Sequence, residues 1–170
     1  MGIVFNLNEA NSSLEDRIRR SSYSIYATGE KGSIGSILFM LKSVESIKEK
    51  STLEKIDIIA SDKELPIEVF GYLDITKQDL IKWAKSKENI DELLVPGDNK
   101  EFRQFVEDNK VVSLFTNGFG DYLVFCPTDG NIYEYEHERF DCIDKSKYIS
   151  VDKFLKLCKD LWKKTKQERL

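Results

Sequence analysis

This chain of 170 residues has one histidine, three prolines, three cysteines and no long apolar run. The cysteines, Cys126, Cys142 and Cys158, are odd in number and form no CxxC pair, so neither a disulfide framework nor a zinc site is predicted. No stretch approaches the roughly 20 apolar residues that cross a bilayer, and the N-terminal sequence lacks the basic start and apolar run of a signal peptide. We therefore expect a cytoplasmic protein with no membrane partner, metal or other cofactor.

The net charge is also small, at -4, because 26 basic residues nearly balance 30 acidic ones. Nucleic-acid binding needs clustered excess Lys and Arg, so it is not predicted. The charge is nevertheless uneven along the chain. Residues 117–141 hold six acids and one base, whereas residues 145–170 hold nine bases and three acids. Such asymmetry steers encounters with charged partners.

Strand signals concentrate after residue 110. Residues 111–115 are rich in β-forming side chains, and Asn117-Gly118 is the strongest two-residue hairpin signal. Residues 121–126 (DYLVFC) are apolar on both alternating faces, which predicts a central strand covered on each side.

A turn, a strand and a helix are predicted to follow. Pro127 to Gly130 has the Pro and Gly positions of a tight turn, and residues 131–137 form a strand whose tyrosines face the core. Ser150 is a candidate N-cap for a helix with apolar residues at helical spacing from Val151 to Thr165.

Upstream, capping patterns and β-forming runs indicate further elements. Helices are predicted after Ser12 with Glu15, from Thr76 with Asp79 to about Lys87, and after Asp98 with Glu101. Strands are predicted at residues 2–7, 23–27, 55–60 and 67–73. Residues 34–50 keep helical spacing, although 37–41 also fit a buried strand; the helix is preferred. No linker divides the chain, so residues 1–170 predict one α+β domain, with a mixed or mainly antiparallel sheet flanked by helices.

Residues 112–125 and 129–138 present a strand, a Gly-x-Gly-Asp turn, an aromatic strand, an Asp-Gly turn and an aromatic strand ending in His-Glu. This order resembles the SUKH superfamily, which is related to Smi/Knr-type fungal cell-wall regulators. The motif positions are Asn117, Gly118, Gly120, Asp121, Gly130, His137 and Glu138. The resemblance is best over about 110–166, where Val151 to Lys166 looks like the closing helix. Leu65 to Leu73 is the nearest match to a further family segment, and residues 1–50 are a divergent part or an extension.

The resemblance implies an immunity protein of a bacterial toxin system, which binds a cognate toxin, often a nuclease, and blocks its active site without performing chemistry. A nuclease needs a basic cleft, so carboxylates would speed its capture. The expected partner-binding residues are Asp129, Glu134, Glu136 and Glu138. Two alternatives remain: a solvated acidic face, and a regulatory or scaffold protein-binding module of the same fold.

A catalytic interpretation is weaker. His137, the one candidate general base, lies between Glu136 and Glu138, but neighbours in a strand point to opposite faces. No Ser-x-Gly elbow or HExxH pattern accompanies it. We therefore expect a structural or rim histidine and no enzyme activity.

The cysteines are also weak nucleophile candidates. Cys126 on a strand and Cys158 on the apolar side of a helix are predicted to be buried filler, whereas Cys142 is placed in a loop and its role stays open.

Overall fold

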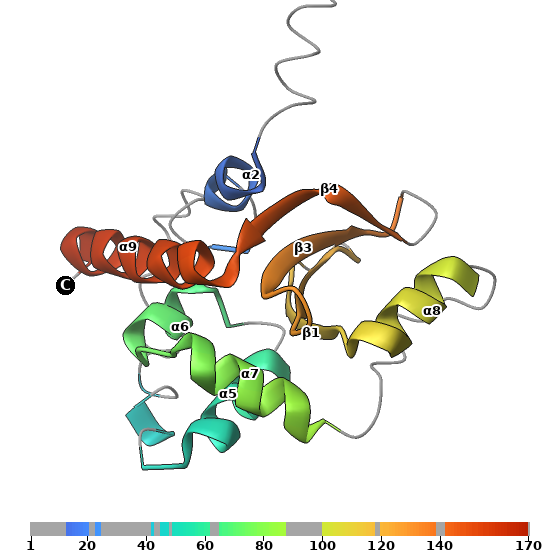
Figure 1. Ribbon diagram of the computed structural model, residues 1–170. Coiled ribbons are helices and arrows are strands. Elements are labelled where there is room, and N and C mark those ends of the chain that lie inside the picture. The colour runs from blue at the N-terminus through green and yellow to red at the C-terminus, as the bar shows by residue number, and fades with distance from the viewer. Residues whose placement is uncertain are drawn as a thin grey trace, which may run out of the picture.

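The computed structural model describes residues 13–20, 23–24, 42, 45–47, 49–61, 65–87, 100–117, 120–138 and 142–169. These residues form six helices and a four-stranded antiparallel sheet (Figure 1). The predicted α+β architecture is therefore confirmed. The strand predicted at 2–7, and most of the segments 23–27 and 34–50, lie outside the described residues.

The sheet has the strand order β1-β2-β3-β4, each strand antiparallel to the next. Its strands are β1 (Val112–Thr116), β2 (Tyr122–Cys126), β3 (Asn131–Glu136) and β4 (Cys142–Ser150). The first three lie where the sequence predicts them. The fourth was not predicted, and the loop assigned to Cys142 was wrong, because Cys142 begins β4. A register shift against β3 and several charged residues hide the apolar alternation of this strand.

The turn predicted at Asn117-Gly118 falls partly outside the described residues, which omit 118–119. On either side of it, Thr116 of β1 pairs with Tyr122 of β2. The Asn117 amide donates to the Asp121 carbonyl at 3.3 Å, and its side chain reaches the Asp121 carboxylate. These contacts between Asn117 and Asp121 hold the adjoining ends of β1 and β2 together.

The turn between β2 and β3 is confirmed. Cys126 pairs with Asn131, and the Gly130 amide donates to the Cys126 carbonyl at 2.9 Å. Gly130 has a φ of 72°, a conformation that glycine adopts without strain.

The helices are α2 (Leu14–Arg20), α5 (Thr52–Ser61), α6 (Glu68–Tyr72), α7 (Lys77–Ser86), α8 (Lys100–Asn109) and α9 (Val151–Arg169). Helices α2, α7, α8 and α9 lie where capping patterns predict them. Thr76 and Asp79 form a reciprocal capping box at α7, and the Ser150 hydroxyl accepts the Lys153 amide at the start of α9. Among the helices of the described residues, none combines the length and apolarity needed to cross a membrane.

Two predicted strands are helices instead. Residues 55–60 lie in α5, whose first turn is closed by a capping box between Ser51 and Glu54. Ile56 and Ile59 are fully buried three residues apart, which is helical spacing. The strand prediction was wrong because a short apolar run fits either structure when its cap is overlooked.

Residues 67–73 lie mostly in α6, which packs closely against α9 (Figure 1). Gly71 makes this approach possible, because a Cβ on it would lie 2.4 Å from the Cys158 carbonyl oxygen. The run was predicted as a strand because it is short and apolar and no capping side chain marks the start of the helix. Its glycine serves close contact between helices and not a strand.

Both faces of the sheet are covered, as predicted for β2. Figure 1 shows α9 and α8 on opposite sides of the sheet. Leu123, Phe125 and Ile132 project into the larger core beneath α9, whereas Val124 and Tyr133 belong to a smaller core beneath α8. The tyrosines of β3 therefore do face a core, but the larger core lies on the other face.

Candidate functional site

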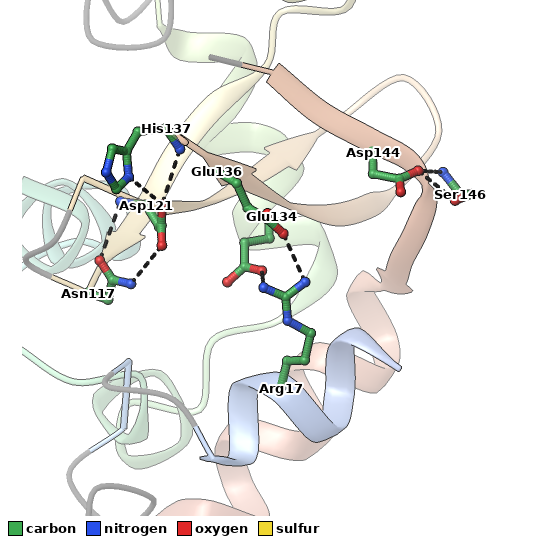
Figure 2. Close-up of polar contacts among 8 residues, drawn as sticks. All are labelled: Arg17, Asn117, Asp121, Glu134, Glu136, His137, Asp144 and Ser146. Atoms are coloured by element: carbon green, nitrogen blue, oxygen red, sulfur yellow. Dashed lines mark hydrogen bonds and ion pairs between the residues drawn. The ribbon is translucent and has the colours of Figure 1, made fainter. Parts of the chain in front are cut away.

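Some of the residues that carry the family resemblance meet at one corner of the sheet. The Asp121 carboxylate accepts the backbone amide of His137 at 3.1 Å and lies 2.8 Å from the imidazole Nδ1 (Figure 2). The Asn117 side chain donates to the other carboxylate oxygen at 3.1 Å. Gly120 has a φ of 98°, and a Cβ on it would lie 3.1 Å from the imidazole Cγ. Asn117, Gly120, Asp121 and His137 thus form one corner in which a larger residue than glycine would crowd the histidine. Gly130 lies in the turn between β2 and β3, and Gly118 lies outside the described residues.

This corner stabilises an ionised carboxylate. Burial acts to raise the pKa of Asp121, but hydrogen bonds from the His137 ring and amide and from Asn117 outweigh it, so the pKa is lowered. The imidazole Nε2 lies 3.9 Å from the Glu138 carboxylate. The expectation that neither glutamate lies beside the ring was wrong, because β3 ends at Glu136 and strand alternation no longer applies. An Asp–His pair orients an imidazole, and here its other nitrogen faces a second carboxylate.

A second polar cluster joins β3 to α2. Arg17 lies with Nη2 2.6 Å from Glu134 and Nη1 2.9 Å from Glu136, because both glutamates point to the same face of the strand (Figure 2). The Glu134 side chain is only 8% exposed. Burial raises its pKa despite the neighbouring guanidinium. This ion pair fastens α2 to the sheet.

The third predicted carboxylate, Asp129, lies in the turn between β2 and β3. It accepts the Asn131 amide at 2.9 Å and the Tyr133 hydroxyl, and it is exposed. Burial and the hydrogen bond to Asp129 raise the pKa of Tyr133 to about 12. The Tyr133 ring in turn contacts Tyr148 of β4, with ring centroids 6.1 Å apart.

The four predicted partner-binding residues therefore do not share one surface. Glu134 is buried and Glu136 is bound to Arg17. Asp129 and Glu138 are exposed, but they lie beyond opposite ends of β3. Sequence reasoning missed Arg17, because nothing local associates residue 17 with residues 134 and 136.

The cysteines and the metal question are simpler. Cys126 and Cys158 are buried, as predicted, and burial raises the pKa of both thiols, which weakens them as nucleophiles. In the described part of the chain, no group of histidine, cysteine and acidic side chains could hold a metal ion.

No protein-family model, curated protein or solved structure matches this chain.

Proposed function

We propose that this chain is a cytoplasmic immunity protein of the SUKH type, which binds a cognate bacterial toxin and occludes its active site. The observation that carries the proposal is the corner formed by Asn117, Gly120, Asp121 and His137. These are four of the positions that carry the family resemblance, and hydrogen bonds join Asp121 to both Asn117 and His137. Their polar groups hydrogen-bond to one another and fix the local backbone, as expected of a motif that defines a fold and not a catalytic centre.

A binding role also agrees with the state of the titratable groups. The Asp121 carboxylate is committed to His137, the Glu134 carboxylate to Arg17, and the Cys158 thiol lies in the core. Catalysis would need a nucleophile, a base and an oxyanion donor around one open position. The proposal therefore assigns this chain recognition and no chemistry of its own.

Of the four predicted partner-binding carboxylates, Asp129 and Glu138 are the two that stay exposed and can meet a toxin. If the toxin is a nuclease, its cleft is basic because it must hold phosphate, so exposed carboxylates would accelerate encounter. The association rate should then fall as the salt concentration rises. A rate that does not respond to salt would place the interface elsewhere.

The proposal predicts a toxin gene beside the gene for this chain, and it is tested with the protein which that gene encodes. The toxin domain is induced in a bacterial host with and without this protein, and survival is measured. Complex formation is followed by calorimetry with a catalytically inactive toxin variant. We expect survival and a complex with micromolar or tighter affinity. If the protein gives no protection and forms no complex at micromolar concentration, the proposal is ruled out.

A further inference from the structure

One aromatic side chain stands out on the surface. Tyr148 is 55% exposed and is the only exposed large hydrophobic residue among those the structure describes. It lies on β4 in register with Tyr133, and the two rings meet at 6.1 Å with an angle of 49°. The buried Tyr133 ring thus supports Tyr148 from one side, and the exposed remainder faces solvent.

The support of Tyr148 is part of an aromatic row. Tyr133 meets Phe105 of α8 edge to face at 6.5 Å, and the Lys145 ammonium lies 4.5 Å from the centre of the Phe105 ring. The aromatic faces here already attract one cation from the chain itself.

A carboxylate lies beside the same row. The Tyr133 hydroxyl donates to Asp129, so the exposed carboxylate and the exposed Tyr148 ring flank one buried tyrosine. The turn holds this carboxylate in place through the Asn131 amide. A ring face and a fixed carboxylate are the two groups that a guanidinium binds best, by stacking and by charge-assisted hydrogen bonds.

We propose that Tyr148 and Asp129 form a docking site for an arginine side chain of a partner protein. The inference rests on the proposed binding function and names the residues that anchor the interface. Tyrosine suits this role because its ring offers a large contact area with little rotamer entropy to lose, and Tyr133 already restricts it. Arginine fits better than lysine, since its flat guanidinium can stack and pair at once.

The first test needs no toxin. The full-length 15N-labelled protein is titrated with hexa-arginine at low salt, and hexaglutamate serves as the probe of opposite charge. We expect saturable shifts at the Tyr148 and Asp129 amides with hexa-arginine alone. Tyr148→Leu, which keeps apolar bulk and removes the ring, should weaken binding about two- to fivefold, the range of an exposed cation–π contact. Asp129→Asn, which can still accept the Asn131 amide, should weaken it as well.

Asp16→Asn is the matched control, because it makes the same change at an exposed carboxylate of α2 and not in the turn between β2 and β3. It should leave hexa-arginine binding unchanged. Shifts spread evenly over the surface carboxylates, or equal affinity in Tyr148→Leu, would overturn the inference.

The second test separates this inference from the proposed function. If the unaltered protein protects against the toxin, Tyr148→Leu should bind it more weakly. Full protection and unchanged affinity in that variant would remove the docking site and leave the immunity role standing. If the unaltered protein gives no protection, the immunity role fails and the peptide titration still decides whether the site binds arginine.

Discussion

Arg17 offers the sharpest test of how this fold is held together. Its guanidinium contacts the carboxylates of Glu134 and Glu136, and α2 adds only the buried side chains of Leu14 and Ile18 to the core. Replacement by methionine keeps much of the length and apolar stem of the side chain but removes the charge. Two carboxylates of β3 would then lie beneath α2 without their cation.

The expected loss follows from burial. Removing one partner of a buried ion pair costs about 3–5 kcal/mol. Arg17 is one-third exposed and Glu136 keeps some contact with solvent, so water can replace part of the interaction. We expect Arg17→Met to lower the free energy of unfolding by about 2 kcal/mol at pH 7, and the melting temperature by about 4–8 °C.

The loss should depend on pH. In the folded protein the pKa of Glu134 is raised above its ordinary value of 4.5, so folding favours the neutral carboxyl. The corresponding stability is present below the unfolded pKa and is lost as pH rises through the folded pKa. Without Arg17 the pKa of Glu134 rises further. The difference between Arg17→Met and the unaltered protein should therefore shrink as pH falls from 7 toward 4.5.

Urea unfolding followed by circular dichroism measures these differences. Arg19→Met is the matched control, because Arg19 lies on the same helix and pairs at 3.2 Å with Glu15 in a half-exposed i,i+4 contact. It should cost less than about 0.5 kcal/mol. Glu134→Gln combined with Arg17→Met should recover part of the loss, since the more deeply buried of the two carboxylates is then neutral. Equal stability of the Arg17 and Arg19 variants would refute the reasoning.

Three further predictions concern other parts of the fold. Gly71→Ala should lower the urea midpoint strongly, because its Cβ would collide with the Cys158 backbone at 2.4 Å and two helices would have to separate. Cys126 and Cys158 should react with a thiol reagent at pH 8 only in urea, since burial raises the pKa of both; rapid labelling of either in the native protein would contradict their placement. The lowered pKa of Asp121 stabilises the protein above the unfolded carboxyl pKa, and this stability is lost as pH falls through the folded value. His137→Ala should reduce that acid-dependent loss in a pH series of urea unfolding, and an unchanged pH dependence would show that the pair does not matter.

Local signals were sufficient for much of the fold. The sequence predicted α7 from the capping box of Thr76 and Asp79, and α9 from the spacing of its apolar residues. Each signal lies within the helix that it predicts or at its start. Ser51 and Glu54 are the same kind of signal for α5, and applying it there would have corrected the strand prediction. Strand β4 could not be found this way, because its pairing with β3 is irregular and its alternation is broken.

The candidate site was harder to predict, because charge counted along the chain differs from charge presented to a partner. The acidic stretch at residues 117–141 suggested a face of carboxylates, but one arginine, over a hundred residues away in sequence, binds both Glu134 and Glu136. Asp121 is likewise bound within the corner of the sheet. The positive charge that α9 presents to solvent is reduced in the same way, because Lys159 pairs with Asp74 at 2.7 Å. A carboxylate attracts a charged partner only if it is exposed and not already neutralised by an ion pair within the fold. The tertiary ion pairs must therefore be known before a run of charge in the sequence is interpreted as an interface.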